Sequence, residues 1–509
     1  MLDTTHSRTT AQKLSLQVAL AIIFGVTLWR VLMLLVNKTD LFVDEAQYWF
    51  WGQNLDFGYY SKPPMIAWVI RFFNAISGSD STFWIRISAP LFHLATALML
   101  MRTTRRLIGS EEGREIAPWV GVIFITLPAA SLSAVLVSTD TIQILFVTIA
   151  IWAFIGLTRR SSVLEAVILG ASLGFAFLTK YSVLFLLPGV GIAMLTMRSA
   201  RIAWRDVVIA AVVGAIVVSP NLWWNFTHDA ATIKHTENIA QWSKDGGSNS
   251  LLKHILNGLS FFGAQFGVIG PVVFYALLWA TWRLIRGRSD DREKLLFWLS
   301  VPVVALITLQ ALLAKAYANW AVSAYAAGTI LAVWLLYRLT KKGLSTSLII
   351  GAVVAFVIPV LTVFAYDIKL PNGDLIMKRY VGRAVISREI ADIATDAKTP
   401  VIVAEDRDIL ADLYYTLKGK PFRIYARNFG GFPNNYYEQN FSLPADVTGP
   451  VLYIDNGPFE CPGSQVDLIK SWSPPYGEMK GKTLHAYRVP ASCLAPKPSA
   501  AAGTGAAEN

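Results

Sequence analysis

Long apolar stretches alternate with short polar links over the first two thirds of the chain. A helix that crosses a bilayer needs about 20 apolar residues, and the pattern predicts eleven such spans. Their expected positions are 14–36, 82–101, 116–136, 139–157, 163–179, 182–197, 206–222, 258–282, 295–314, 319–337 and 345–366. The links at Ser138-Thr139 and Lys180-Tyr181 are so short that they require tight hairpins. The pattern therefore predicts an α-helical polytopic membrane protein.

The pattern changes after the last apolar stretch. Two β-like runs, 401–404 and 451–454, alternate with helix-like runs at 385–397 and 409–417. Alternation of this kind is typical of a small α/β domain. We therefore expect a transmembrane domain at 1–366, an α/β domain at 367–495 and, because its composition is rich in Ala, Gly, Pro and Ser, a disordered tail at 496–509.

Composition supports lipid as the solvent of the first region. Of the 509 residues, 54% are hydrophobic and only 16% are charged, whereas about 25% are charged in soluble proteins. The net charge of +11 would indicate nucleic acid as the partner of a soluble protein. Here most of the surplus lies between apolar stretches, so no nucleic-acid partner is expected. The first apolar stretch is long enough to span and lacks a small-residue cleavage site after it, so no cleavable signal peptide is predicted.

The distribution of Lys and Arg predicts the orientation. With a cytoplasmic N-terminus, the inside segments hold 19 Lys and Arg residues and the outside loops through residue 366 hold nine. The positive-inside rule favours that arrangement, and an odd number of spans places the C-terminal domain outside. Cys461 and Cys493 both lie in this domain. An oxidising compartment allows a disulfide between them, but spacing in sequence does not say how far apart they are.

The first outside loop carries the most specific group of polar residues. Asp44 and Glu45 follow the first span directly, and an aromatic stretch at 48–51 suits a helix at the membrane interface. Lys62 precedes two prolines, which hold it in an extended conformation. The run 65–73 reads as a second interfacial helix that is too short to span.

A carboxylate, a rigidly held cation and aromatic rings together make a site for an amphiphile with an anionic head. A lysine binds phosphate as a point charge, and a carboxylate can act as a general base on a hydroxyl group. The alternative is an aromatic belt with a solvated acidic pair and a lysine that reaches toward the interface.

At these residues the sequence resembles the lipid-linked, GT-C type glycosyltransferases of bacterial inner membranes. The nearest groups are glycosyltransferase family 39, the aminoarabinose transferase ArnT and the rhizobial lipopolysaccharide galacturonic acid transferases. The resemblance rests on Asp44-Glu45 and Lys62-Pro63-Pro64 in one loop, together with 138–141 (Ser-Thr-Asp-Thr) and 174–180 (Gly-Phe-Ala-Phe-Leu-Thr-Lys) at outer helix ends. It covers about residues 14–340, and the C-terminal domain lies outside it.

The resemblance implies a role for each matching residue. Asp44 corresponds to the catalytic base, with Glu45 supporting it, and Lys62 and Lys180 correspond to ligands of the leaving polyprenyl phosphate. Asp140 corresponds to an acidic position near the donor sugar. ArnT has an acidic residue before the Lys-Pro-Pro lysine, where this chain has Ser61. We therefore predict no required metal, and no cofactor is expected.

Further outside residues complete the predicted site. Lys315 lies at a third outer hinge and is expected to join the phosphate clamp, while Tyr59, Tyr60 and His235 are candidates for sugar or acceptor binding. Lys180, Asp140 and His235 also have structural alternatives. Lys180 can be an interfacial lysine, Asp140 has the N-cap position of the following helix as its alternative, and a lone histidine such as His235 is more often structural.

The function predicted from these features is an inverting glycosyltransferase at the periplasmic face of the bacterial inner membrane. Its donor is a polyprenyl phosphate that carries galacturonic acid or aminoarabinose. Its acceptor is lipid A or lipopolysaccharide core, and membrane lipids surround the protein. Protein O-mannosylation from a similar donor is the alternative enzyme. A transporter or lipid flippase is an alternative of another class, although ionisable residues gather at the outer ends of spans, with exceptions such as Arg30 and His93. A non-catalytic scaffold for polymer assembly is a third class.

Overall fold

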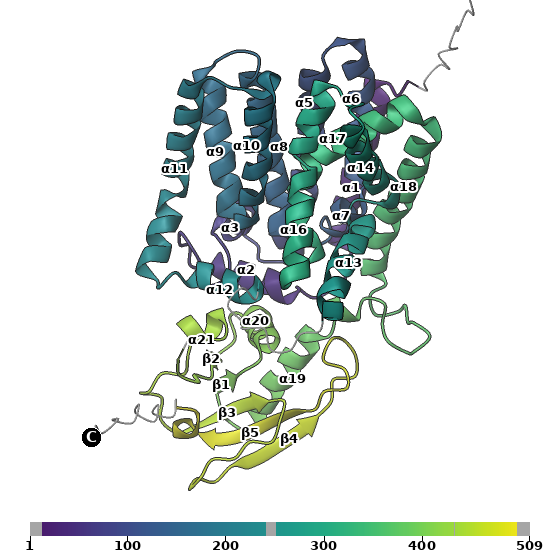
Figure 1. Cartoon of the computed structure of the whole chain (residues 1–509). Coiled ribbons are helices and arrows are strands. Elements are labelled where there is room, and N and C mark those ends of the chain that lie inside the picture. The colour runs from purple at the N-terminus through teal and green to yellow at the C-terminus, as the bar shows by residue number, and fades with distance from the viewer. Residues whose placement is uncertain (1–12, 241–250, 432, 496–509) are drawn as a thin grey trace, which may run out of the picture. The chain divides into compact units, whose positions relative to one another are not determined.

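The computed structural model describes residues 13–240, 251–431 and 433–495, and the chain forms two compact units (Figure 1). The helical unit comprises residues 1–37 and 56–360, and the sheet unit comprises 38–55 and 361–509. The predicted boundary after residue 366 therefore lies close to the second junction, but residues 38–55 leave the predicted membrane domain and fold with the sheet unit. The predicted disordered tail, 496–509, lies outside the described residues.

Helices make up the helical unit. Its elements are α1 (Leu16–Leu35), α3 (Met65–Ser77), α4 (Thr82–Arg86), α5 (Ser88–Ile108), α6 (Ser110–Thr126), α7 (Pro128–Leu132), α8 (Thr139–Leu157), α9 (Val163–Thr179), η1 (Tyr181–Leu186), α10 (Leu187–Thr196), η2 (Arg198–Ala200), α11 (Trp204–Thr227), α12 (Ala231–Ala240), α13 (Leu251–Val268), α14 (Pro271–Ile285), α15 (Asp291–Trp298), α16 (Val301–Leu313), η3 (Ala318–Ala321), α17 (Ala324–Leu339) and α18 (Lys341–Val363), whose last turn belongs to the sheet unit. The second interfacial helix predicted at 65–73 is present as α3.

Within the described residues, six helices are long and apolar enough to cross a membrane, or seven if one bent pair is a single span. That pair, α13 and α14, bends by 119°, so the span predicted at 258–282 is not one continuous helix. Gly270 has a φ of +88°, a conformation that favours glycine, and Pro271 cannot continue the preceding helix.

Several other predicted spans correspond to helices that are short for a membrane span. Three of them correspond to the apolar helices α9, η1–α10 and α17, each shorter than 18 residues. The span predicted at 116–136 ends as a helix at Thr126, because Pro128 starts a separate short helix. The polytopic helical fold is confirmed, whereas the count of eleven spans stays a prediction.

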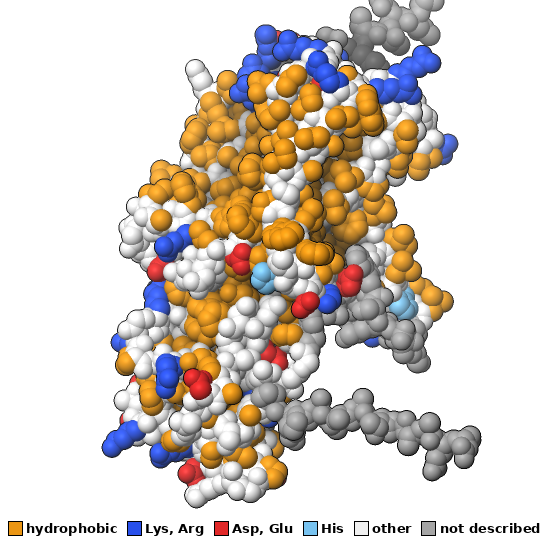
Figure 2. Space-filling view, turned by 90° about the vertical axis from the view of Figure 1, so that its left-hand side faces the viewer, with side chains coloured by type: hydrophobic (Ala, Val, Ile, Leu, Met, Phe, Trp, Pro, Cys, Tyr) orange, Lys and Arg blue, Asp and Glu red, His pale blue; other side chains and the backbone are white. Residues whose placement is uncertain are grey.

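Burial separates the central helices from the outer ones. Every residue of α17 from Ala324 to Leu336 is buried, and this helix packs against α6 and α14. Only 11% of the apolar window of α11 is buried, so this helix has an apolar outer surface suited to lipid. Figure 2 shows hydrophobic side chains over much of the visible face of the helical unit.

Arg30 and His93, two ionisable residues within apolar stretches, are hydrogen bonded inside the bundle. Arg30 donates to the carbonyl oxygen of Ile125 at 2.7 Å and to Ser131 Oγ at 3.0 Å. The His93 ring lies 2.9 Å from Ser133 Oγ. Each therefore ties its own helix to the segment around α6 and α7 and has a structural role.

Basic residues of the predicted cytoplasmic segments share one end of the helical unit. Arg338 pairs with Glu112 at 2.7 Å and with Glu293 at 3.1 Å, and Arg283 pairs with Glu293 at 3.0 Å. Arg292 donates to the carbonyl oxygen of Ile108 at 2.7 Å. Lys and Arg gather at the upper end of this unit in Figure 2. The alternation of segments between two ends therefore agrees with the predicted topology.

The sheet unit contains a mixed five-stranded sheet of order β2-β1-β3-β5-β4. β2, β1 and β3 are parallel, and β5 and β4 are antiparallel. The elements are α2 (Val43–Trp51), η4 (Lys378–Tyr380), α19 (Arg383–Asp396), β1 (Val401–Ala404), α20 (Arg407–Thr416), β2 (Arg423–Ala426), α21 (Tyr436–Asn440), β3 (Pro450–Asp455), β4 (Asp467–Trp472), β5 (Leu484–Pro490) and η5 (Ala491–Leu494). The predicted strands at 401–404 and 451–454 and both predicted helices are present.

Residues 38–55 belong to the sheet unit through specific contacts. The Lys38 N–H donates to the Thr362 carbonyl at 3.1 Å, and the Asp40 carboxylate accepts the Arg383 N–H at 2.9 Å at the start of α19. Burial raises the pKa of Asp40, although hydrogen bonds from backbone N–H groups oppose the shift. The Phe50 ring lies 4.3 Å from that of Tyr414. The helix that carries Asp44 is thus an integral part of this unit.

A disulfide closes the far side of the sheet unit. Cys461 and Cys493 are bonded, with their Cα atoms 5.7 Å apart. A loop of this length stabilises a fold by roughly 3–4 kcal/mol. The pairing that spacing left open is therefore present, and it is the form expected in an oxidising compartment.

Candidate active site

Asp44 and Glu45 occupy the first turn of α2 and have different surroundings. Glu45 is 1% exposed, and its Oε2 accepts the N–H of Phe42 at 2.9 Å. It therefore caps the helix that carries Asp44, and negative charge in a first turn also suits the helix dipole. The Asp44 side chain is 42% exposed. Of the two predicted catalytic carboxylates, only Asp44 is accessible to a substrate.

Arg407, the first residue of α20, holds Asp44 from the side. Its guanidinium group pairs with the Asp44 carboxylate and donates through Nε to Gln47 Oε1 at 2.8 Å. Burial alone would lower the pKa of Arg407, but the charge and hydrogen bonding of Asp44 raise it. The arginine thus stays cationic and fixes both α2 side chains. The sequence reasoning missed it, because 363 residues separate the partners.

The Lys62 loop in the helical unit is anchored at several points. Asp56 accepts the indole N–H of Trp224 at 2.7 Å, and Gly58 packs so closely on the Trp224 ring that a Cβ would lie 2.3 Å from it. The Lys62 carbonyl accepts the Tyr59 N–H at 3.2 Å. The loop therefore has a defined backbone up to the two prolines and α3, as the sequence predicts.

The three predicted sugar contacts beside this loop have structural partners. Tyr59 and Tyr60 are 3% and 4% exposed, and the Tyr59 carbonyl accepts the Thr232 hydroxyl at 2.6 Å. The His235 ring lies 4.8 Å from the Tyr60 ring. These contacts join the loop to α12, and sugar binding by Tyr59, Tyr60 and His235 stays a prediction.

Asp140 and Lys180 lie together at the ends of α8 and α9. The Lys180 ammonium group is 2.6 Å from Asp140 Oδ1, and the two side chains are only 11% and 9% exposed. Asn319 donates to the other carboxylate oxygen of Asp140, and Gln143 donates to the Lys180 carbonyl at 2.7 Å. The structure therefore brings a predicted phosphate ligand and a predicted sugar-site carboxylate into one enclosed pair.

Two hydrogen bonds connect this pair to the Lys62 loop. The Tyr181 hydroxyl donates to Asn221 Oδ1 at 2.9 Å, and Asn221 Nδ2 donates to the Phe57 carbonyl at 2.7 Å. Asn319 brings the third hinge to the same place, whereas the ammonium group of Lys315 lies over the Tyr317 ring at 4.8 Å. The predicted outer segments thus meet, but Asn319 rather than Lys315 makes the contact with Asp140.

Asn221, Asn319 and Thr232 are residues that sequence reasoning did not assign to the site. Asn319 follows Lys315 in the hinge that was singled out, and Asn221 lies next to Pro220 near the end of α11. The signal that could have identified Asn319 and Asn221 is a polar residue close to an interfacial lysine or a proline.

Sequence comparison finds glycosyltransferases that are similar to this chain. The family model of dolichyl-phosphate-mannose-protein mannosyltransferases matches residues 61–224. The lipid A galacturonosyltransferase RgtD of Rhizobium johnstonii is 56% identical over 94% of this chain and 99% of its own length. The lipopolysaccharide core galacturonosyltransferase RgtB of the same organism is 25% identical over 50% of each chain.

Solved structures show the same fold. ArnT from Cupriavidus metallidurans bound to undecaprenyl phosphate matches with a TM-score of 0.61 at 14% identity, over 95% of this chain and 100% of ArnT. The apo form of that enzyme matches with a TM-score of 0.56 at 14% identity, over 94% and 98% of the two chains. With a relative as similar as RgtD over nearly the whole length, the chain belongs to the GT-C type, lipid-linked glycosyltransferases, in the group of the rhizobial galacturonosyltransferases.

Proposed function

We propose that this glycosyltransferase moves galacturonic acid from a polyprenyl phosphate to lipid A at the periplasmic face of the inner membrane. The observation that carries the proposal is the similarity to the lipid A galacturonosyltransferase RgtD, which extends over 94% of the chain. ArnT, which shares the fold, binds undecaprenyl phosphate, a donor carrier of the proposed class.

In the proposed step an acceptor hydroxyl attacks the anomeric carbon of the donor sugar. Its oxygen forms the new glycosidic bond while the bond from that carbon to the phosphate oxygen breaks, with inversion. Asp44 accepts the hydroxyl proton as general base. The electron pair of the broken bond remains on the polyprenyl phosphate, where Lys62 and Lys180 stabilise the developing charge.

The environment of Lys180 supports a role with phosphate. A lysine ammonium group has three N–H donors, and in the described part of the chain Asp140 is its only side-chain partner. The remaining donors are therefore available to a phosphate oxygen. Asp140 and the Gln143 contact with the Lys180 backbone limit the movement of the lysine, which favours a preorganised site.

Two other acceptors remain to be distinguished by experiment. The matching family model is named for protein mannosylation, and RgtB acts on lipopolysaccharide core. The high identity to RgtD over the full length favours lipid A over both. Membership of a glycosyltransferase family leaves the transporter and scaffold alternatives without support.

The test compares lipid A from a deletion strain complemented with the wild-type chain, Asp44→Asn or Asp446→Asn. Mass spectrometry should detect the galacturonic acid substituent with the wild-type chain and with Asp446→Asn, which removes the same charge from an exposed position of the sheet unit. Asp44→Asn should lower transfer by about 10²- to 10⁴-fold, the range for a general base, at unchanged protein level. Near-normal transfer by Asp44→Asn would refute the base assignment, and a substituent on core or protein alone would refute the acceptor.

A further inference from the structure

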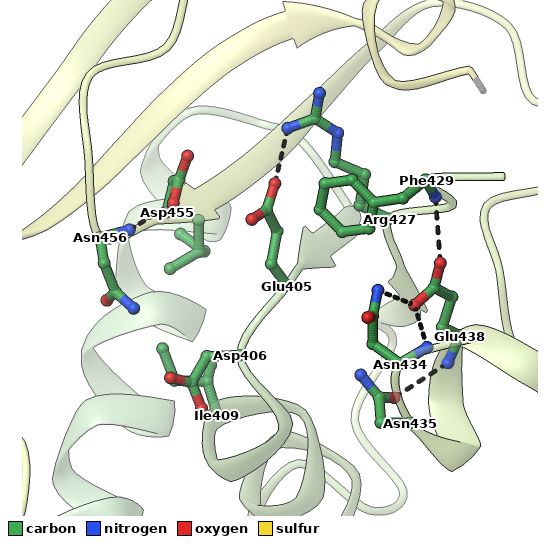
Figure 3. A pocket seen from close by; sticks show the side chains of 11 residues that line it. Glu405, Asp406, Ile409, Arg427, Phe429, Asn434, Asn435, Glu438, Asp455 and Asn456 are labelled. Atoms are coloured by element: carbon green, nitrogen blue, oxygen red, sulfur yellow. Dashed lines mark hydrogen bonds and ion pairs between the residues drawn. The ribbon is translucent and has the colours of Figure 1, made fainter. Parts of the chain in front are cut away.

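The sheet unit contains a cavity that the proposed transfer step does not use. It has a volume of about 260 Å³, close to the lower end of the roughly 300–1,000 Å³ typical of ligand sites. The cavity opens where the three parallel strands end, at Glu405 and Asp406 after β1, Arg427 after β2, and Asp455 in the last position of β3 (Figure 3). Ligands of open α/β sheets bind beyond the carboxyl ends of parallel strands.

The walls of the cavity carry mostly acceptor groups. Glu405, Asp406, Asp455 and Glu438 are its carboxylates, and Arg427 is the one cation among the described lining residues. Arg427 is already engaged, since it pairs with Glu405 at 2.6 Å. The cavity therefore has an excess of negative charge and disfavours phosphates and uronic acids.

The arrangement of these carboxylates does not suit a metal ion. No group of three or more His, Cys, Asp or Glu residues in the described ranges lies close enough to hold one. In Figure 3, Asp455 and Asn456 line one side of the space, and Asn434, Asn435 and Glu438 line the other. A ligand that reaches both sides must present several separate polar groups.

Amides and apolar side chains complete the lining. Asn434, Asn435 and Asn456 add groups that both donate and accept, and Phe429 and Ile409 add apolar surface. Glu438 is bound by the backbone N–H groups of Phe429 at 3.1 Å and Asn434 at 2.8 Å, so the loop that forms this wall is held in place. Hydroxyl groups on a ring with apolar faces are complementary to such a lining.

We infer that this cavity binds a sugar residue that is uncharged or carries an amine. Its hydroxyl groups would bond to carboxylates and amides, an amine would add an attractive charge, and Phe429 and Ile409 would contact the ring. The adjoining residue, Arg407, follows Asp406 and pairs with Asp44, so a bound sugar would adjoin the helix that holds the proposed base. If the acceptor is a glycolipid, as the proposed function has it, the bound sugar would be a residue of that acceptor other than the one that reacts.

The test measures binding directly, on the purified full chain in detergent. Saturation-transfer difference NMR with glucosamine and methyl glucoside should give signals that the cavity variants reduce. Galacturonate is the sugar of the proposed donor, so any signal that it gives should be unchanged in those variants. Asp455→Asn and Asn456→Ala should each weaken glucosamine binding by about tenfold, the effect of losing one good hydrogen bond or charge contact. Glu460→Gln, which removes a charge from an exposed position of the same loop, should leave binding unchanged.

Asp44→Asn separates this inference from the proposed function, since it should strongly lower transfer and retain sugar binding. Phe429→Ala offers a further variant, because its ring is 47% exposed and its loss should weaken binding without unfolding the sheet. A galacturonate signal that the cavity variants reduce, a glucosamine signal unaffected by all three of these variants, or no signal from either glucosamine or methyl glucoside would each overturn the inference.

Discussion

The two units each contain a carboxylate–cation pair among the candidate residues, and the pairs differ in exposure. In the helical unit, Lys180 and Asp140 are 11% and 9% exposed. In the sheet unit, Arg407 and Asp44 are 38% and 42% exposed. Removing one partner of an enclosed pair leaves a buried charge and costs about 3–5 kcal/mol. An exposed pair contributes only about 0–1 kcal/mol.

The difference indicates what each pair does. Asp140 holds Lys180 at a fixed place in an environment where electrostatic effects are strong, as a ligand for a leaving phosphate requires. The side chains of Arg407 and Asp44 are more accessible to solvent, so the contact of Arg407 with Asp44 and Gln47 is better explained by orientation of the proposed base. Substitutions at Lys180 and Arg407 test this contrast, and a substitution at the buried carboxylate Asp412 extends it. They follow in order of decreasing expected effect.

The largest effect is expected from Lys180→Met. It removes a proposed phosphate ligand and leaves Asp140 without its cation, so transfer should fall by about 10²- to 10³-fold, the usual cost of one preorganised transition-state donor. Initial rates with polyprenyl-phosphate donor in detergent would measure it.

The double variant Lys180→Met with Asp140→Asn identifies the cause. The amide introduced by the second substitution would keep an acceptor for Asn319 without a buried charge, so the double variant should unfold at a higher temperature than Lys180→Met alone. Its transfer rate should stay low, because the phosphate ligand is still missing. Recovery of both stability and rate would mean that Lys180 serves only as the counter-ion of Asp140.

A smaller effect is expected from Arg407→Gln. The base loses its orienting partner but not its carboxylate, so kcat should fall by about tenfold, since small misplacement of a reacting group reduces rate, while KM stays near its wild-type value. Arg407→Lys should recover part of the rate. A faster Arg407→Gln variant would instead show that the arginine restrains the base.

The smallest effect concerns Asp412, a carboxylate on the same helix as Arg407 that forms no ion pair within the described ranges of the chain. It is 1% exposed and accepts hydroxyl hydrogen bonds from Ser387 at 2.6 Å and Thr416 at 2.9 Å. Burial raises its pKa from 3.8 to about 6. Between these two pKa values the folded protein keeps a proton that the unfolded chain releases. The free energy of unfolding therefore falls as the pH rises from about 4 to about 6, by at most about 3 kcal/mol.

Asp412→Asn removes that dependence and keeps an acceptor for both hydroxyls. Calorimetry of the full chain should find its melting temperature a few degrees above wild type at pH 7.5 and little changed at pH 4. Asp446→Asn, at an exposed position, is the matched control. A lower melting temperature for Asp412→Asn at pH 7.5 would contradict the predicted burial cost.

Sequence reasoning worked where a property is local. Apolar length located α8 and α11, the double proline located the start of α3, and the charge pattern separated the two ends of the helical unit. The sequence did not predict the bend at Gly270-Pro271. Apolar composition indicates whether a segment suits lipid, but it does not show where a helix breaks. Sequence reasoning also missed Arg407, Asn221 and Asn319, since their contacts join segments that only the folded chain brings together.

The placement of residues 38–55 in the sheet unit has a consequence for the order of synthesis. The ribosome makes the helix with Asp44 early, yet the rest of its unit begins at residue 361. At about 5–20 residues per second, that helix waits on the order of 20–90 s for Arg407 and the complete sheet. A nascent or truncated chain would therefore insert its spans with the proposed base unsupported, and competence for transfer would arrive only with the end of translation.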